Sequence, residues 1–396
     1  MKENVLIAQS GGPSMVINQS LVGAVTACLG IRCAGKIYGA LHGIQGILDD
    51  RLIDFRKESR KNLERVAATP SSALGSVRRK PDEADCAKIL EALRARDISH
   101  FFYIGGNDSA ETAHLVARAA EAAGDSLSCI HIPKTIDNDL RANDHTPGYG
   151  SAAKFVACAV LGDDLDNRAM GGVKIDVIMG RHAGFLAAAS ALARVAPDSG
   201  PHLIYLPERP FSMEKFVKDV QRVMKRLGRC VVAVSEGIAD KDGVPVAAAF
   251  SKETDSHGNL QLSGTGALGD LLANHLKKAT DIRRVRADTF GYLQRSFVGV
   301  VSETDAEEAR RVGQVAVAAA FNGISRGSVT IQRKPGKRYE PMFVIQPLEE
   351  VAKFTRPMPR EFISRSGNDV TQAFLDYARP LVGALPPVGF LAAVKA

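Results

Sequence analysis

Apolar runs of strand length alternate with alanine-rich helical patterns along most of this chain. Residues 5–8 form the first such run, and a Ser-Gly-Gly-Pro turn separates it from a helical pattern over residues 17–29. Residues 101–104 lead in the same way into a glycine-containing turn and a helix that ends near residue 123. Strands that alternate with helices predict an α/β fold, with mostly parallel sheets and helices on both faces.

The same pattern recurs further along the chain. Residues 175–179 run into the turn Gly180–Gly184, and a helix is predicted to continue through Arg194. Residues 231–234 run into a second turn over residues 235–237. Because parallel strands point the same way, such turns share one edge of a sheet, where backbone N–H groups and helix N-termini bind anions.

The length of 396 residues is large for a single hydrophobic core, so we expect two Rossmann-like domains. Residues 240–265 are rich in turn-forming residues and predict a hairpin or a surface excursion. Beyond about residue 335 proline becomes more frequent and the periodicity weakens, which indicates a peripheral extension.

Composition favours a soluble, cytoplasmic protein. Hydrophobic residues make up 45% of the chain, yet no apolar stretch reaches the roughly 18 residues of a membrane span, so no membrane partner is expected. The six cysteines include no Cys-x-x-Cys pair, and several lie in apolar segments, where a free thiol behaves as a small hydrophobe. Such usage is typical of a reducing compartment.

The net charge of +7 does not indicate a nucleic-acid partner. Basic residues are scattered, and no run interleaves them with aromatic residues. Short clusters such as Arg78-Arg79-Lys80 suit a small polyanion better, and a positive field would also speed its capture.

The segment Pro133–Asp139 is the most informative in the chain. It places Lys134, a threonine hydroxyl and two carboxylates directly after a strand-like apolar run. A lysine can neutralise a phosphate, a carboxylate can accept a hydroxyl proton, and a metal ion can bridge the charges, so the group suits phosphoryl transfer. Asp137 is the candidate general base because it is nearer to Lys134 and to the strand end, whereas Asp139 would hold the loop. A solvated turn is the alternative.

A second motif, Gly105–Ser109, lets the backbone approach a phosphate closely. Asn107 offers a carbonyl oxygen to Mg²⁺, which prefers oxygen ligands. Asp108 is unexpected there, because a carboxylate repels phosphates. It either faces solvent in the first turn of a helix or excludes a competing ligand, and its position in the sequence favours neither.

Separated arginines and one glutamate complete the candidate chemistry. Arg181, Arg286 and Arg295 can bind phosphate bidentately, although each taken singly is an ordinary surface arginine. Glu236 either accepts hydrogen bonds from sugar hydroxyls or caps the following segment. The chain has no zinc-ligand spacing, no Gly-x-Ser-x-Gly elbow and no Walker-type phosphate loop.

In this order the motifs resemble those of the phosphofructokinases, over most of the chain. The matching segments are Ser10–Gly12, Gly105–Ser109, Pro133–Asp139, Met179–Arg181, Glu236 and Arg286–Arg295. The resemblance implies that Asp137 removes the proton of the 1-hydroxyl of fructose 6-phosphate. It implies a sugar-phosphate pocket made of Thr135, Ile136, Asp137, Met179, Gly180, Arg181, Glu236, Tyr292 and Arg295. Arg286 would reach that pocket from a neighbouring subunit, implying a homodimer or homotetramer. The donor would be bound by Gly11, Gly12, Arg78, Gly106 and Ser109.

Two positions distinguish the donors used within this family. Members that use ATP commonly carry Gly-Gly-Asp-Gly-Ser and Pro-Gly-Thr-Ile-Asp-Asn-Asp, and here Asp108 and Lys134 replace one glycine of each motif. Both replacements are similar to those of the pyrophosphate-using branch. The Asp108 carboxylate would repel the α-phosphate of a nucleotide, while Lys134 can stabilise a departing phosphate. Tyr292, where ATP-using members commonly have histidine, indicates the same donor.

The chain also departs from the family pattern. Many relatives have aspartate where this chain has Asn107, the predicted magnesium ligand. ATP-using members have an arginine at the position of Gly172, for which Lys174 is the nearest substitute.

The resemblance therefore predicts reversible, Mg²⁺-dependent phosphoryl transfer from pyrophosphate to fructose 6-phosphate, with Asp137, Lys134 and Asp108 as the catalytic set. Residues 1–148 with about 294–345 would form the phosphate-donor domain, and about 149–293 the sugar-phosphate domain, with the active site in the cleft between them. Residues from about 346 to 396 would be a peripheral C-terminal extension. The alternatives are an ATP-dependent 6-phosphofructokinase and a non-catalytic sensor of phosphorylated sugars.

Overall fold

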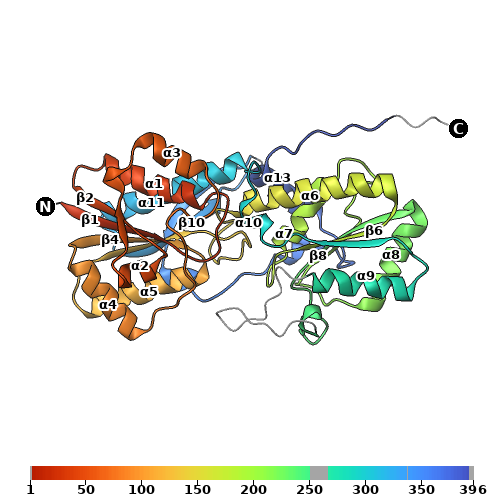
Figure 1. Ribbon diagram of the computed structural model, residues 1–396, viewed down its shortest axis with the longest axis horizontal. Coiled ribbons are helices and arrows are strands. Elements are labelled where there is room, and N and C mark those ends of the chain that lie inside the picture. The colour runs from red at the N-terminus through yellow and green to blue at the C-terminus, as the bar shows by residue number, and fades with distance from the viewer. Residues whose placement is uncertain (1, 250–265, 337, 392–396) are drawn as a thin grey trace. The chain divides into compact units, whose positions relative to one another are not determined.

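The computed structural model describes residues 2–249, 266–336 and 338–391. These residues form two compact units, each with its own sheet and core (Figure 1). One unit contains residues 2–152 and 292–357, and the other contains the described residues of 153–291 together with 358–391. Each unit is therefore built from segments that are far apart in the sequence.

The first unit is built on a seven-stranded sheet with the order β11-β10-β5-β4-β1-β2-β3. Its strands are β1 (Glu3–Gln9), β2 (Ala34–Ala40), β3 (Leu52–Asp54), β4 (Ile98–Gly105), β5 (Ser128–Pro133), β10 (Arg326–Arg333) and β11 (Pro341–Gln346). All neighbours pair in parallel except β2 with β3 and β10 with β11. The central strands β1, β4 and β5 are buried over most of their length because helices cover both of their faces.

Helices cover this sheet in two layers (Figure 1). One layer contains α1 (Ile17–Gly30), α3 (Arg60–Ala68) and α11 (Glu303–Phe321), and the other contains α2 (Ile44–Leu48), α4 (Glu83–Arg94) and α5 (Asn107–Ala122). Successive residues of β1 serve the two cores in turn: Val5 and Ile7 pack under the first layer, and Leu6 and Ala8 under the second. This two-residue period is the geometry of a strand buried on both faces.

The helices α1 and α11 approach each other unusually closely because each has a glycine at the crossing. A Cβ atom on Gly23 would lie 2.2 Å from the Arg310 carbonyl oxygen, and one on Gly313 would lie 2.2 Å from the Ser20 carbonyl oxygen. Both contacts involve backbone, which cannot move aside without shifting a helix. The pair therefore sets the spacing of this layer.

The second unit contains a four-stranded sheet with the order β7-β8-β6-β9, parallel throughout. Its strands are β6 (Gly172–Ile178), β7 (Leu203–Tyr205), β8 (Arg229–Ser235) and β9 (Val285–Thr289). Its helices are α7 (Phe185–Ala189), α8 (Met213–Leu227), α9 (Ala267–Ala279) and α13 (Gln372–Val382), and α6 (Tyr149–Met170) leads into it. The predicted α/β class with mostly parallel sheets is confirmed.

The structure differs from the predictions in the segment that ends at Arg194. Instead of one helix, α7 is followed by a 3₁₀ turn over Ser190–Ala193, and Arg194 adopts an extended conformation. The Arg194 guanidinium donates to the Pro201 carbonyl oxygen at 2.8 Å and pairs with Asp369 at 2.8 Å. These bonds, of which the one to Asp369 is long-range, hold Arg194 in an extended conformation where the local pattern indicated a helix.

The C-terminal residues contribute to both units. β11 extends the seven-stranded sheet, and α12 (Leu348–Val351) buries Leu348 and Val351 in the same unit. In the second unit α13 buries Phe374 and Leu381. The elements in this part of the chain are short and separated by prolines, so its hydrophobic periodicity is weak. The burial of these side chains could therefore not be predicted from the sequence pattern. Of the predicted excursion over 240–265, residues 250–265 lie outside the described residues.

No helix among the described residues is both long enough and apolar enough to cross a membrane.

Candidate active site

Three loops meet at the carboxyl edge of the seven-stranded sheet. They follow β1, β4 and β5, which are neighbours in the sheet. The Ser10 amide donates to the Ile104 carbonyl oxygen at 2.9 Å, and the Lys134 amide donates to the Gly105 carbonyl oxygen at 2.9 Å. The hydroxyl groups of Ser10 and Ser109 hydrogen-bond each other. The motifs Ser10–Gly12, Gly105–Ser109 and Pro133–Asp139 therefore form one surface, as their positions after strands indicated.

Lys134 is buried within this surface, with 3% of its area exposed. Its Nζ donates to the Gly12 carbonyl oxygen at 2.6 Å. Gly11 has a φ of 74°, and a Cβ atom there would lie 3.1 Å from the same Nζ. A Cβ atom on Gly12 would lie 3.3 Å from the guanidinium carbon of Arg295. Glycine at 11 and 12 thus keeps the backbone close to two cationic side chains.

The surroundings of Lys134 hold charges of both signs. Its pKa falls to about 7, mainly because burial disfavours the ammonium, and further because of the positive charges of Arg295 and Arg78. Asp137 and Asp139 act in the opposite direction. An anionic ligand would add to that opposing effect, so this lysine would take up a proton when such a ligand binds.

Thr135 connects the two carboxylates of the loop. Its hydroxyl accepts a hydrogen bond from the Asp137 amide at 3.1 Å and donates to the Asp139 carboxylate at 3.4 Å. Burial and the nearby charge of Asp137 raise the pKa of Asp139 to about 7. Asp139 is thereby hydrogen-bonded within the loop.

The rest of this loop is held by Arg356, which follows the last strand of the unit. Its Nε and Nη2 donate to the backbone and side-chain oxygens of Asn138, both at 3.0 Å, and its amide donates to the Asp139 carbonyl oxygen at 2.8 Å. Asn138 has a φ of 60°, in the left-handed region that asparagine tolerates better than most residues. Arg356 therefore stabilises the backbone turn immediately after Asp137.

A buried histidine holds the end of the same loop. The two ring nitrogens of His145 lie 2.8 Å and 2.6 Å from carboxylate oxygens of Asp144 and Glu308. Burial disfavours the imidazolium, but the two carboxylates outweigh it and raise the pKa of His145. Gly148 and Ser151 follow this loop in the sequence. The Asp305 carboxylate accepts a hydrogen bond from the amide of each, both at 2.8 Å. The loop that carries Asp137 is thus fixed at both ends.

Asn107 and Asp108 occupy the first turn of α5. The side-chain oxygen of Asn107 is buried and has no hydrogen-bond partner among the described residues. That makes it an available oxygen ligand, and it fits a bound Mg²⁺ or one of that ion's waters. Asp108 is exposed, and its carboxylate lies where the N-terminal end of a helix favours negative charge.

Of the basic cluster at residues 78–80, only part faces this surface. Arg79 pairs with Asp85 at 2.6 Å and Lys80 with Glu111 at 2.7 Å, so both charges are already neutralised. Arg78 is exposed, and its charge reaches Lys134. The assignment of Arg78 to the donor, which the resemblance implied, stays a prediction.

Tyr292 and Arg295 belong to the first unit. The Arg295 guanidinium carbon lies 4.6 Å from the centre of the Tyr292 ring, in a cation–π contact. The resemblance places both residues in the sugar-phosphate pocket. Their contacts within this unit put Arg295 beside Gly12 and Lys134, next to the donor loops. Ile136 of the adjoining loop is buried.

The remaining sugar-phosphate candidates lie at the carboxyl edge of the second sheet. Ile178 and Ser235 are register partners at the ends of β6 and β8, and the Glu236 amide donates to the Ile178 carbonyl oxygen at 2.8 Å. The Ser235 hydroxyl donates to the Gly180 carbonyl oxygen at 2.6 Å. Gly180 has a φ of 135°, a conformation that requires glycine. The resulting group is Met179, Gly180, Arg181 and Glu236.

Arg286 does not join that group within the unit. It pairs in register with Lys174, five residues before Met179, so it lies about 16 Å along the sheet from the edge that carries Met179. Its side chain is exposed. Lys174 is not a free substitute for the missing arginine, because its Nζ bonds to Asp288 and lies 3.4 Å from Asp163. Gly172 has a φ of 79°, and a Cβ atom there would lie 2.5 Å from the Arg284 carbonyl oxygen.

The phosphofructokinase family model matches residues 4–320, which include all of the motifs described above. The chain belongs to the phosphofructokinase family.

Individual relatives of this phosphofructokinase cover nearly its whole length. The chain is 56% identical over 384 residues to a pyrophosphate–fructose 6-phosphate 1-phosphotransferase from Rhodospirillum rubrum, covering 96% of this chain and 95% of the relative. It is 32% identical over 390 residues to a sulfofructose kinase from Alkalicoccus urumqiensis, covering 97% and 96%. The crystal structure of a pyrophosphate-dependent phosphofructokinase from Nitrosospira multiformis superposes with a TM-score of 0.88 at 33% identity, covering 99% of this chain and 95% of that one.

Sequence reasoning missed the residues that support the site of this phosphofructokinase. Arg356 is separated from Asn138 by 218 residues, and His145 is separated from Glu308 by 163. Neither pair belongs to a local motif. The weak signal available was the unusual proximity of Asp144 and His145 to the Pro133–Asp139 motif.

Proposed function

We propose that this chain catalyses Mg²⁺-dependent transfer of a phosphoryl group from pyrophosphate to the 1-hydroxyl of fructose 6-phosphate. The products are fructose 1,6-bisphosphate and phosphate, and the reaction runs in both directions. The observation that carries the proposal is the buried Lys134, bonded to the Gly12 carbonyl and surrounded by Arg78, Arg295 and Asp137. The identity of 56% with the Rhodospirillum rubrum phosphotransferase supports the same substrates.

In this proposal Asp137 is the general base. The 1-hydroxyl oxygen forms a bond to the nearer phosphorus of pyrophosphate while its proton passes to Asp137. The bridging P–O bond breaks, and its electron pair goes to the departing phosphate. The ammonium of Lys134 stabilises that phosphate, with Arg295 beside it. The clamp formed by Arg356 keeps the loop backbone fixed, so that Asp137 needs little reorganisation during the reaction.

Magnesium would be held at the start of α5. The Asn107 side-chain oxygen is the protein ligand that the site offers, and donor phosphates and waters would complete the coordination. When bound, the ion supplies positive charge that offsets the phosphate oxygens.

The choice of donor depends on two side chains. The exposed carboxylate of Asp108 would repel the α-phosphate of a nucleotide, and Lys134 occupies the space beside Gly11 that a glycine at 134 would leave open. Gly12, Gly106 and Ser109 line the donor surface with backbone and hydroxyl groups. Together these features favour pyrophosphate and disfavour ATP.

The sugar phosphate would be bound by Met179, Gly180, Arg181 and Glu236, together with Thr135 and Tyr292. Arginine suits the 6-phosphate, and the buried Glu236 carboxylate suits sugar hydroxyls. Arg286, at the other end of its sheet, would serve the pocket of a neighbouring copy, so we propose a homo-oligomer. All six cysteines are free, which agrees with a cytoplasmic location.

Donor preference is the first test of this function. We expect turnover with pyrophosphate and fructose 6-phosphate, and turnover with ATP at least about a hundredfold lower, because the Asp108 carboxylate opposes a nucleotide. Initial rates with each donor at saturating sugar phosphate measure the ratio. Replacing Asp108 and Lys134 by glycine should lower kcat/KM for pyrophosphate, and Lys80→Gly provides a control that also removes a cation. Substantial ATP turnover without pyrophosphate turnover would refute the proposal.

A sensor without catalysis is tested by Asp137→Asn. If Asp137 is the general base, kcat falls by about 10²–10⁴, while the dissociation constant of fructose 6-phosphate changes little. Rate assays and calorimetric titration measure the two quantities separately. An unchanged kcat would exclude Asp137 as the base. The same rate assays with sulfofructose in place of fructose 6-phosphate distinguish the proposed activity from that of the sulfofructose kinase of Alkalicoccus urumqiensis.

A further inference from the structure

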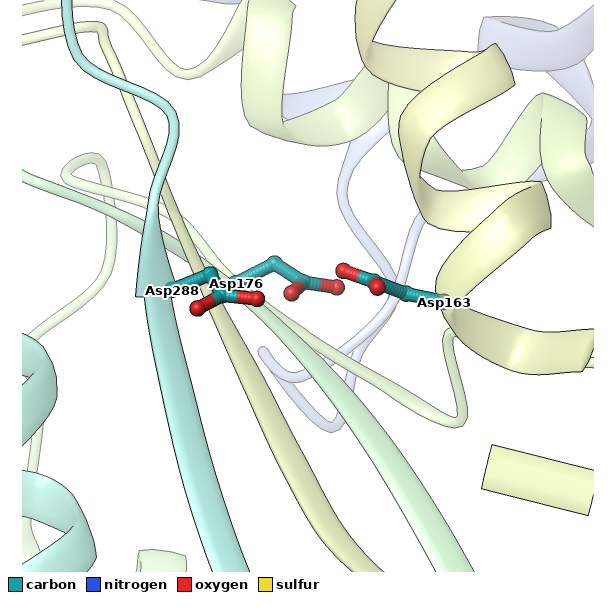
Figure 2. A group of neighbouring side chains, drawn as sticks. All are labelled: Asp163, Asp176 and Asp288. Atoms are coloured by element: carbon teal, nitrogen blue, oxygen red, sulfur yellow. The ribbon is translucent and has the colours of Figure 1, made fainter. Parts of the chain in front are cut away.

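The second unit contains a group of three carboxylates outside the proposed active site. Asp163 lies on α6, Asp176 in the middle of β6 and Asp288 on β9. One oxygen atom from each lies within 4.8 Å of the other two, and the three side chains point toward one another (Figure 2). Asp176 and Asp288 are register partners on neighbouring strands, so their side chains leave the same face of the sheet, where α6 brings Asp163.

Asp176 is the unusual member of the group. Its exposed fraction is 0%, and neither of its carboxylate oxygens has a hydrogen-bond partner among the described residues. Burying an ionised carboxylate without partners is costly. Burial, followed by the charge of Asp163, raises the pKa of Asp176 well above its usual range. The charge of Lys174 acts in the opposite direction, but no cation is hydrogen-bonded to the Asp176 carboxyl among the described residues.

Lys174 compensates only part of the negative charge. Its Nζ bonds to Asp288 and lies 3.4 Å from Asp163. One ammonium cannot pair with all three carboxyl groups, and both contacts of Lys174 are with the outer members, Asp163 and Asp288. Burial opposes the ammonium, but the bond to Asp288 and the neighbouring carboxylates outweigh it and raise the pKa of Lys174.

We propose that Asp163, Asp176 and Asp288 bind a divalent cation, Mg²⁺ or Ca²⁺. Both are hard cations that prefer carboxylate oxygens, and ligands on opposite sides of Ca²⁺ are about 4.8 Å apart. The spread of the three oxygens thus permits one shared ion. The Asp288 side chain is 58% exposed, so water can reach the remaining coordination positions.

The cation would connect three elements. β9 is the edge strand of its sheet, and it is the strand that carries Arg286, two residues before Asp288 and on the same face. Binding to carboxylates from α6, β6 and β9 would hold this edge strand in place. The site goes beyond the proposed reaction, because Asn107 and the donor loops belong to the other unit.

Titration calorimetry of the intact, chelator-treated protein without pyrophosphate tests the proposal. Mg²⁺ and Ca²⁺ are titrated in separate experiments. Mn²⁺ is used in a third experiment, as a paramagnetic probe of the same site. We expect one saturable site that Asp176→Asn and Asp288→Asn each weaken at least tenfold. Asp166→Asn is the matched control: it removes the same charge from an exposed position of the same helix and should leave binding unchanged. Because Asp288 is exposed, its variant should fold even if the Asp176 variant does not.

Two further measurements distinguish a cation from a shared proton. Lys174→Met should strengthen cation binding about tenfold, because the ammonium no longer competes for two of the ligands. Cation at about a hundredfold excess over the wild-type Kd should raise the thermal unfolding midpoint of the wild type by about 5 °C, and that of Asp288→Asn by at most about half as much. Absence of saturable binding in both wild type and Lys174→Met would overturn the proposal. Equal loss in Asp166→Asn would also overturn it.

Discussion

At the scale of single residues, Lys134 shows how one substitution can define a site. Its Nζ occupies the space against Gly11 and Gly12, and burial together with two neighbouring arginines makes its charge costly. A lysine placed in this way is only partly protonated near neutral pH, so its charge depends on what binds beside it. The sequence predicted the cation and the carboxylates, since they lie within one motif. It could not predict the depressed pKa of Lys134, which depends mainly on burial and further on Arg295, more than 150 residues away.

This pKa makes donor use depend on pH. Because burial lowers the pKa of Lys134 to about 7, the ammonium of the free enzyme is lost as pH rises above that value, and the donor anion then binds less well. We expect kcat/KM for pyrophosphate to fall by up to about tenfold per pH unit above 7, relative to a Lys134→Met variant. Taking the ratio of wild type to variant cancels the titration of pyrophosphate itself.

The control for this pH dependence is Lys80→Met, which removes an exposed lysine already paired with Glu111. That variant should keep the wild-type profile. If the ratio of wild type to Lys134→Met does not change between pH 6 and 9 (a range of about 3 units around the expected midpoint), Lys134 is not the titrating group.

At the scale of elements, the strand-turn-helix units determine where the loops of the site lie, and contacts between residues distant in the sequence hold those loops in their conformation. The alternation of patterns was sufficient to predict that the loops after β1, β4 and β5 share an edge, because parallel strands allow no other placement. It was insufficient for Arg356 and for the extended conformation of Arg194, since Arg356 bonds to Asn138 and Arg194 pairs with Asp369, both distant in the sequence. The close crossing of α1 and α11 could not be predicted either. Periodicity identifies the apolar face of a helix but does not give the distance between two packed helices.

The close crossing of α1 and α11 leads to a prediction about the stability of the folded protein. In Gly313→Ala the new Cβ would lie 2.2 Å from the Ser20 carbonyl oxygen, so α1 and α11 must separate. We expect the free energy of unfolding to fall by about 1–3 kcal/mol, as in other overpacked cores. Urea denaturation monitored by circular dichroism measures the change.

Gly30→Ala is the control for this substitution. Gly30 is the last residue of α1, and a Cβ atom there would meet nothing within 4 Å. The variant should be as stable as the wild type or slightly more stable, because alanine is the better helix former. Equal stability of Gly313→Ala and the wild type would mean that the helices are not held at this spacing.

At the scale of the whole molecule, each unit supplies a different kind of chemistry. The first concentrates cations and carboxylates at one sheet edge, around Lys134 and Asp137. The second presents Met179–Arg181 and Glu236 at the carboxyl edge of its sheet and Arg286 about 16 Å away along the strands. One copy of the second unit therefore cannot bring Arg286 to its own Glu236. The sequence resemblance already implied a contribution between copies, and this separation supplies a physical reason for it.

Complementation between two inactive variants tests that contribution. Asp137→Asn lacks the base, and Arg286→Ala lacks the arginine offered to the neighbour. If Arg286 acts across copies, a hybrid dimer has one site with both defects and one site with neither. Mixing equal amounts after subunit exchange should restore up to about a quarter of wild-type activity, since half of the dimers are hybrids with one intact site. Rate assays before and after exchange measure the recovery. No recovery from subunits shown to have exchanged would mean that Arg286 serves its own copy or none, and the proposed arrangement of the pocket would have to be abandoned.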